Sequence, residues 1–173
     1  MINKWNFQTP SEEELHKRDQ LVAELGFSPV ICLLLVQRGI TSIEEAKKFF
    51  KPSLNDLHDP FLMPDMDKAV RRLNKALGNK EKILIYGDYD VDGTTAVSLV
   101  FKYLRPYSST LDFYIPDRYD EGYGISYKGI DYAAENGVSL VISLDCGIKA
   151  IEKIEYAKEK GICLLYTSPS PRD

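Results

Sequence analysis

Several patterns that mark particular classes of protein are missing from this 173-residue chain. Its three cysteines are odd in number and include no CxxC spacing, which favours reduced thiols in the cytoplasm. The longest uninterrupted apolar run, Val30 to Val36, is too short to span a bilayer, so no membrane partner is expected. The first residues, MINKWNFQTP, contain no apolar signal core, so we expect no secretion.

A surplus of basic residues is also lacking. Residues 1–78 carry 11 basic and 11 acidic side chains, whereas residues 79–162 carry 10 basic and 14 acidic ones, so the net charge of −4 arises in the second segment. Proteins that bind nucleic acids usually present a basic face, so composition by itself argues against such a partner. Bound divalent cations, which favour hard oxygen ligands, would balance the acidic excess.

The first 78 residues predict a helical N-terminal segment. In TPSEEELHKRDQLVAELG, Ser11 is a candidate N-cap and Glu14 follows three residues later, which is the capping-box pattern. Further helices are expected in SPVICLLLVQRGI, TSIEEAKKFFKP and MDKAVRRLNKALGNK. The stretch LNDLHDPFLMPD is interrupted by two prolines and predicts a loop.

From residue 79 onward, short apolar runs alternate with helical stretches. Strands are predicted at 83–86, 111–115 and 139–144, and helices at 94–103, 128–136 and 149–160. This alternation is typical of a parallel sheet with helices on both faces. We therefore expect an α/β fold with a Rossmann-like parallel sheet over residues 79–162.

Three carboxylates follow directly on the first predicted strand. The stretch KILIYGDYDVDG places Asp88, Asp90 and Asp92 at alternate positions, where repulsion and desolvation oppose folding unless something compensates them. Asp145 follows the strand LVISL, and ligands of such sheets bind beyond the carboxyl ends of the strands. Divalent metals held by carboxylates hydrolyse phosphoesters. We interpret Asp90, Asp92 and Asp145 as metal ligands and Asp88 as a further ligand or an orienting residue.

Two plainer interpretations of this cluster compete with the metal site. The first is an ordinary acidic loop, and the second is a calcium loop of the EF-hand type. An EF-hand loop needs a glutamate at its twelfth position, which is Leu99 when counted from Asp88. Gly87 and Gly93 flank the cluster and would let backbone and ligands approach closely.

Three motifs carry a resemblance to a known family. The stretches YGDYDVDGTTAVSL, FYIPDRYDEGYGIS and LVISLDCGI, in this order and spacing, resemble the DHH phosphoesterase family, and in particular its exonucleases specific for single-stranded DNA. The upstream stretch RGITSIEEAKKFFKPSLNDLHDPFLMPDMDKAVRRL is similar to the helical segment that precedes the catalytic domain in those enzymes, so the resemblance covers residues 15–162. It implies a cytoplasmic enzyme with two Mn²⁺ or Mg²⁺ ions that removes nucleotides from the 5′ end of single-stranded DNA, with other DNA-repair proteins as further partners.

The resemblance also implies roles for individual residues. Asp90 and Asp92 match the metal ligands of the first motif, Asp145 matches the ligand of the DCGI motif, and Asp88 matches an acidic position beside the metals. The middle motif contributes three residues that would bind the substrate phosphate: Arg118, Tyr123 and Gly124.

Arg118 would clamp a phosphate because a guanidinium group matches phosphate geometry. The alternative for this motif is a turn that needs Gly122 and Gly124, with Arg118 paired to Asp117 or Asp120.

The end of the sequence departs from the family pattern. An Asp-His-His triplet is expected near residues 168–170, but the chain has Ser168, Pro169 and Ser170 there, and the prolines cannot continue a central strand. The tail CLLYTSPSPRD resembles translated adaptor sequence, so we expect residues 163–173 to be non-native, the alternative being a natural Ser/Pro-rich terminus. Without these imidazole ligands, we expect the fragment itself to bind Mn²⁺ weakly and to be inactive.

Two other functions compete with this one. The first is a DHH-family phosphodiesterase for nanoRNA or cyclic dinucleotides, which would share the acidic motifs but usually lacks the long helical segment and IPDRYDEGYG. The second is a non-catalytic module that binds a metal or a nucleotide.

Overall fold

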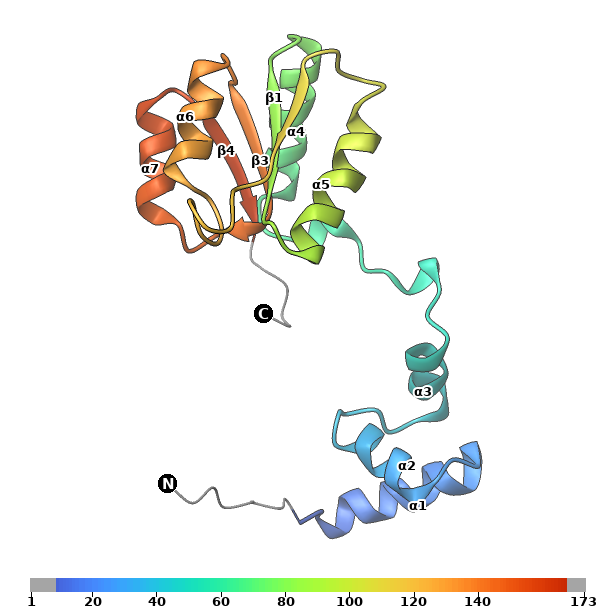
Figure 1. Cartoon of the computed structure of the whole chain (residues 1–173). Helices are drawn as coiled ribbons and strands as arrows, with labels where there is room; N and C mark the ends of the chain where they lie inside the picture. Colours follow the sequence, from blue (N-terminus) through green and yellow to red (C-terminus); the bar gives the residue numbers. More distant parts are fainter. Residues whose placement is uncertain (1–8, 168–173) are drawn as a thin grey trace, which may run out of the picture. The chain divides into compact units, whose positions relative to one another are not determined.

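The computed structural model describes residues 9–167, and the chain divides into two compact units between Pro60 and Phe61 (Figure 1). The first unit is helical and the second contains the sheet. Across residues 9–167, no helix is both long enough and apolar enough to cross a membrane.

The described part of the first unit, residues 9–60, contains three α-helices and one complete 3₁₀ turn. Their bounds are α1 (Glu12–Leu25), α2 (Pro29–Val36), α3 (Ile43–Phe50) and η1 (Leu54–Asp56). The predicted capping box is present, since the Ser11 side chain accepts a hydrogen bond from the Glu14 N–H and the Glu14 side chain accepts one from the Ser11 N–H. A small apolar core holds the three helices together, and its buried members are Leu21, Cys32, Leu35, Val36 and Ala46.

A short 3₁₀ turn spans the boundary between the units, and the second unit continues with a long helix and then an alternating α/β chain. The elements are η2 (Pro60–Leu62), α4 (Met66–Gly78), β1 (Ile83–Gly87), α5 (Val91–Leu104), β2 (Leu111–Tyr114), α6 (Tyr127–Glu135), β3 (Leu140–Gly147), α7 (Ile151–Glu159) and β4 (Cys163–Thr167). All strand pairs are parallel and the order is β2-β1-β3-β4. The predicted α/β fold with a parallel sheet is confirmed.

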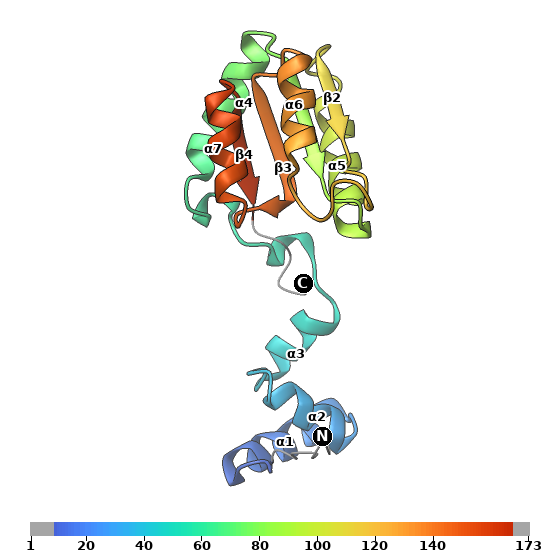
Figure 2. The ribbon, with the colours of Figure 1, turned by 60° about the vertical axis from the view of Figure 1, so that its left-hand side comes forward.

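Helices cover both faces of the sheet (Figures 1 and 2). On one face, Tyr86 and Val141 pack with Ile130 of α6 and Ala157 of α7. On the other face, the alternate β1 residues Ile83 and Ile85 pack with Ala76 of α4 and Val97 of α5. The central strands β1 and β3 are therefore covered by apolar residues on both faces, which explains the uninterrupted apolar runs in the sequence.

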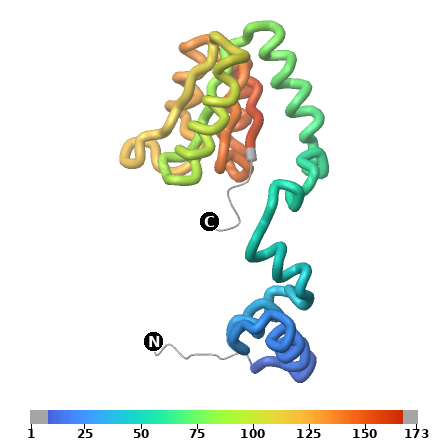
Figure 3. The backbone as a smooth tube through the Cα atoms, turned by 90° about the vertical axis from the view of Figure 1, so that its right-hand side faces the viewer, coloured from blue at the N-terminus to red at the C-terminus, as the bar shows by residue number. Residues whose placement is uncertain are grey.

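Helix α4 belongs to the sheet unit, although we grouped it with the helical segment 1–78. Its residue Ala76 is fully buried against the sheet, and α4 runs beside the sheet in Figure 3. A polar bridge adds to this packing, because the Arg72 guanidinium lies 2.7 Å from the Glu81 carboxylate, which accepts a 2.6 Å hydrogen bond from Ser139. The unit boundary thus falls after Pro60, because the apolar face of α4 is buried by the strands that follow it in sequence.

The last described residues also differ from the expected tail. Residues 163–167 form β4, which pairs with β3 through the register Leu140 to Cys163 and Val141 to Leu164. Three apolar residues, Cys163, Leu164 and Leu165, pack against the two core clusters, so this segment has the pattern of a covered strand. Ser168, Pro169 and Ser170 lie outside the described residues.

Candidate active site

The first acidic motif forms the junction between β1 and α5. Asp88 follows the last residue of β1, and Asp90 is the N-cap of α5, its Oδ1 accepting a 2.8 Å hydrogen bond from the Gly93 N–H. The helix therefore starts at Val91 rather than at the expected Thr94, because an aspartate is a strong N-cap. Asp92 lies in the first turn, and this residue is exposed.

Two glycines make this junction tight. A Cβ atom on Gly93 would come within 3.0 Å of backbone atoms of Asp88, and one on Gly87 would come within 3.0 Å of Val97 and of the Gly93 carbonyl. The start of α5 is thus packed directly onto the backbone that follows β1. This close approach is the structural reason for the two glycines that flank the aspartates.

Asp88 is the buried member of the cluster. Its side chain is 0% exposed, and its two carboxylate oxygens accept hydrogen bonds from the backbone N–H groups of Tyr89 at 2.7 Å and Gly124 at 2.8 Å. Burial raises the pKa of Asp88, and the nearby charges of Asp90 and Asp145 raise it further. The carboxylates of Asp88, Asp90 and Asp145 therefore lie close enough to interact electrostatically.

Asp90 is held from the opposite side by the middle motif. Its Oδ2 accepts a 2.6 Å hydrogen bond from the Tyr123 hydroxyl. This bond, followed by the one from the Gly93 N–H, lowers the pKa of Asp90. The two neighbouring aspartates thus have pKa values displaced in opposite directions, Asp88 by burial and Asp90 by hydrogen bonds.

Asp145 approaches the cluster from the end of β3. Its backbone has φ 58°, in the left-handed region, where non-glycine residues are uncommon and often mark functional sites. Its Oδ2 atom is buried. The adjoining Cys146 thiol has its pKa raised to about 12 by burial, with further contributions from Asp88 and Asp145, so it is a protonated packing residue.

The middle motif forms a turn that carries two of the predicted phosphate-binding residues to the cluster. Gly122 and Gly124 adopt φ 78° and 83°, so the expected glycine turn is present. Arg118 lies with its guanidinium 5.3 Å from the centre of the Tyr89 ring. The ion pair that Asp120 forms is with Lys128, at 3.8 Å, rather than with Arg118. The same loop therefore forms the glycine turn and brings Tyr123 and Gly124 to the acidic cluster.

A set of polar contacts that sequence reasoning missed holds this loop in place. The Glu121 carboxylate accepts hydrogen bonds from the Tyr114 hydroxyl, the Asp117 N–H and the Ser126 hydroxyl. The buried Tyr86 hydroxyl donates to the Gly124 carbonyl at 2.9 Å and accepts from the Ser126 N–H at 3.0 Å. Nothing in the spacing of these residues indicates that they meet.

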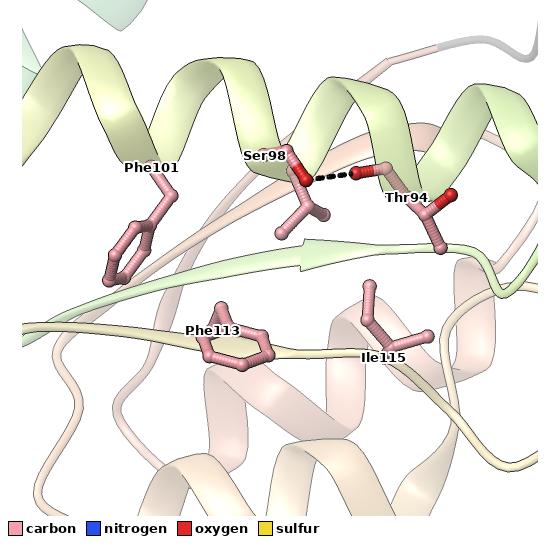
Figure 4. Close-up of a pocket in the computed structure, with 6 residues that line it drawn as sticks. Thr94, Ser98, Phe101, Phe113 and Ile115 are labelled. Atoms are coloured by element: carbon pink, nitrogen blue, oxygen red, sulfur yellow. Dashed lines mark hydrogen bonds between the residues drawn. The ribbon is translucent and has the colours of Figure 1, made fainter.

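Two hollows lie near these residues. One, of about 380 Å³, is lined by Tyr123, Gly124, Ile125, Asp145, Cys146, Gly147, Lys149, Ala150 and Lys153, so it adjoins the acidic cluster. The other, of about 190 Å³, lies between α5 and β2, where Phe101 and Phe113 approach edge to face (Figure 4). The second hollow contains no ionisable side chain, so the chemistry of the site belongs to the first.

The carboxylate oxygens of the acidic cluster are suitable ligands for a hard divalent cation, but the described residues do not provide a complete set of ligands. Carboxylate oxygens are the ligands that Mg²⁺ and Mn²⁺ prefer, and Asp88, Asp90 and Asp145 interact at one rim. Within residues 9–167, however, no three histidine, cysteine or acidic side chains are arranged as a ligand set. The described residues thus offer suitable donor types but no complete ligand set, and the assignment of Asp90, Asp92 and Asp145 as metal ligands stays a prediction.

A comparison with known families matches the segment that contains these residues. Residues 82–167, which hold all the acidic and loop residues above, match the DHH family, N-terminal domain. Residues 82–167 therefore form a domain of the DHH family.

Within this family, the chain is similar to the single-stranded-DNA-specific exonuclease RecJ. It is 38% identical to RecJ of Bacillus subtilis (strain 168) over 95% of this chain and 20% of the relative, and 31% identical to RecJ of Escherichia coli (strain K12) over 89% and 26%. The chain thus corresponds to a short part of a RecJ-type protein and spans about a fifth to a quarter of those relatives.

Two solved structures resemble this one. A crystal structure of exonuclease RecJ bound to manganese aligns with a TM-score of 0.54 and 28% identity over 60% of this chain and 27% of that chain. RecJ from Thermus thermophilus in complex with Mn²⁺ aligns with a TM-score of 0.64 and 22% identity over 91% and 22%, which supports the fold. Divalent metal therefore accompanies both solved proteins.

Proposed function

We propose that this chain is the N-terminal part of a nuclease that hydrolyses phosphodiesters of single-stranded DNA from the 5′ end with the help of two divalent metal ions. The observation that carries the proposal is the meeting of acidic side chains from two strand ends with one loop. Asp88 and Asp90 follow β1, Asp145 lies near the end of β3, and the loop that contains Tyr123 and Gly124 is hydrogen-bonded to the first two. The relatives to which this chain is similar are named as single-stranded-DNA-specific exonucleases.

In this proposal, Asp90, Asp92 and Asp145 hold Mn²⁺ or Mg²⁺, with Asp88 beside them. Such ions, when bound, lower the pKa of a water molecule and stabilise the attacking and leaving oxygens of the phosphodiester. Hydrogen bonds to both oxygens keep Asp88 and Asp90 in fixed orientations, which limits the rearrangement needed for binding.

The residues of the middle motif would orient the substrate. Arg118 lies at the aromatic pair formed by Tyr89 and Tyr123, whose ring centres are 5.4 Å apart. A guanidinium group can bind a phosphate through two parallel hydrogen bonds, and Arg118 is thus the proposed phosphate clamp. Tyr123 and Gly124 would form the adjoining wall of the hollow.

The proposal also includes a cytoplasmic location and encounters with other DNA-repair proteins.

We further propose that the 173-residue chain alone is inactive. Its sequence has Ser-Pro-Ser at 168–170, where the family resemblance calls for imidazole ligands. With these ligands missing, the remaining aspartates would bind Mn²⁺ weakly. Appreciable metal-dependent degradation of single-stranded DNA by the purified chain would contradict this part of the proposal.

A chimeric enzyme tests the proposed activity directly. Residues 15–162 would replace the aligned segment of the Bacillus subtilis RecJ, and degradation would be followed on single-stranded oligonucleotides labelled at either end. We expect Mn²⁺-dependent degradation from the 5′ end, abolished by Asp145→Asn and retained by Asp131→Asn, a carboxylate that pairs with Lys160 away from the cluster. A well-folded chimera that cleaves cyclic dinucleotides or short RNA but not DNA would overturn the substrate assignment.

A further inference from the structure

We propose that Lys149 and Lys153 form a binding site for a backbone phosphate of the nucleic-acid strand, in the hollow beside the acidic cluster. The inference deepens the proposed function and rests on it for the choice of nucleic acid as the ligand. Neither lysine belongs to the residues that the sequence motifs single out.

The two lysines are brought to the hollow by the start of α7. Lys149 precedes the helix and Lys153 lies in its first turn, four residues later, and both line the hollow. The Lys153 Nζ lies 5.8 Å from the centre of the Tyr127 ring, a cation–π contact that favours one position of this ammonium group.

The charges of these lysines are available to a ligand. Within residues 9–167, neither Lys149 nor Lys153 forms an ion pair with a carboxylate. Lys158 and Lys160, in and just after the same helix, are both paired, with Glu155 at 2.6 Å and with Asp131 at 2.9 Å. The helix region thus carries two neutralised and two unneutralised ammonium groups, and the unneutralised pair lines the hollow.

The charge balance of the hollow favours an anion. Its charged lining residues are Asp145, Lys149 and Lys153, which give a net charge of +1 within a segment whose overall charge is negative. A volume of about 380 Å³ accommodates a phosphate with its sugar. Because Tyr123 lines this hollow and also donates to Asp90, a phosphate bound here lies next to the acidic cluster. A strand is therefore held beside the position where its phosphodiester would be cut.

The test measures how strongly the full chain binds a short fluorescent oligothymidylate as salt is raised. Each neutralised phosphate contributes a slope of about −0.7 in log K against log[salt] for single strands, so Lys149→Ala/Lys153→Ala, which removes the site of one phosphate, should make the slope shallower by about 0.7. The matched control, Lys158→Ala/Lys160→Ala, removes the same charge from the same helix region and should leave the slope unchanged. Lys149→Arg/Lys153→Arg retains both charges and should restore binding. Circular dichroism melting checks that each variant is folded.

Each result supports or overturns the inference. Equal slopes for the two double-alanine variants, or no measurable binding by the unaltered chain at low salt, would overturn it, as would a folded arginine variant that fails to restore binding. Binding is measured in EDTA, without cleavage, so it is independent of the proposed activity. A lysine-dependent slope combined with an inactive chimera would reject the nuclease function alone, and an active chimera with no lysine effect would reject this inference alone.

Discussion

The Tyr123 hydroxyl donates a 2.6 Å hydrogen bond to Asp90 Oδ2 across 33 positions of sequence. Next to it, the Gly124 N–H donates to Asp88 Oδ2 at 2.8 Å. Two adjacent residues of the loop are therefore hydrogen-bonded to Asp88 and Asp90, the two aspartates at the β1–α5 junction. The middle motif and the acidic motif are parts of one site because the loop is fixed to both carboxylates.

The first prediction concerns Tyr123→Phe, which removes the donor to Asp90. A hydrogen bond to a charged group contributes about 1.5–3 kcal/mol, but Tyr123 is 53% exposed and water competes for the carboxylate. We expect a loss of about 0.5–1 kcal/mol in the free energy of unfolding, measured by urea denaturation. Tyr119→Phe, in the same loop and 92% exposed, is the control and should have no measurable effect. Equal effects of the two substitutions would show that the Asp90 contact adds no stability.

The second prediction concerns Gly93→Ala at the start of α5. The added methyl group would come within 3.0 Å of the Asp88 backbone, which cannot move without displacing β1. We expect destabilisation of about 2–3 kcal/mol, measured by thermal or urea unfolding. Gly78→Ala is the matched control, because this glycine also lies in a helix but has nothing within 4 Å of its Cβ position. There we expect no loss and a gain of less than about 0.5 kcal/mol, because Gly78 is the last residue of α4 and helix propensity counts for less at a helix end. Destabilisation by both substitutions alike would contradict the steric explanation.

The third prediction concerns the buried hydroxyl of Tyr86. Tyr86→Phe leaves the Gly124 carbonyl and the Ser126 N–H without this partner. Because unpaired buried groups are costly, we expect a loss of about 1–3 kcal/mol in the free energy of unfolding. Amide hydrogen exchange at Ser126 should also become faster. Tyr103→Phe removes a hydroxyl from an exposed tyrosine of α5 and should change stability by less than about 0.5 kcal/mol. Unchanged exchange at Ser126 would argue against a role of Tyr86 in holding the loop.

The fourth prediction concerns the pH dependence of stability through Glu121. Burial acts to raise the pKa of this carboxyl, but hydrogen bonds from the Asp117 N–H, Ser126 and Tyr114 outweigh it and hold the pKa below its ordinary value of 4.5. A carboxylate with a pKa lowered by folding stabilises the protein above its unfolded-state pKa, and that contribution disappears as pH falls through the folded-state pKa.

The corresponding experiment compares Glu121→Gln with the unaltered chain by urea denaturation at about pH 7 and about pH 3. The stability difference should be largest at neutral pH and should shrink on acidification. Glu135→Gln is the control, since Glu135 is an exposed residue at the end of α6, and its effect should be small at both pH values. A difference that grows at low pH would contradict the hydrogen-bonded, ionised state of Glu121.

The elements of the fold followed from local patterns in the sequence. The period of apolar residues distinguishes strand from helix, so the runs at 83–86, 111–115 and 139–144 indicated a parallel sheet without knowledge of any contact. The same patterns placed the start of α5 at Thr94 instead of Val91. An aspartate that caps a helix and one that binds a metal look alike in sequence, and Asp90 was interpreted only as a metal ligand although it is the N-cap of α5. They also grouped α4 with the wrong unit, since an amphipathic helix does not reveal which surface buries its apolar face.

By itself the sequence determined the class of fold and the three acidic and loop motifs, because these depend on residue types at short, fixed spacings. Only the tertiary structure decided which of these residues meet. The contacts of Tyr123 with Asp90 and of Gly124 with Asp88, across 33 and 36 positions of sequence, depend on it. Such contacts join segments that are brought together by the path of the chain through the sheet, and that path is set by the burial of both sheet faces rather than by the motifs themselves.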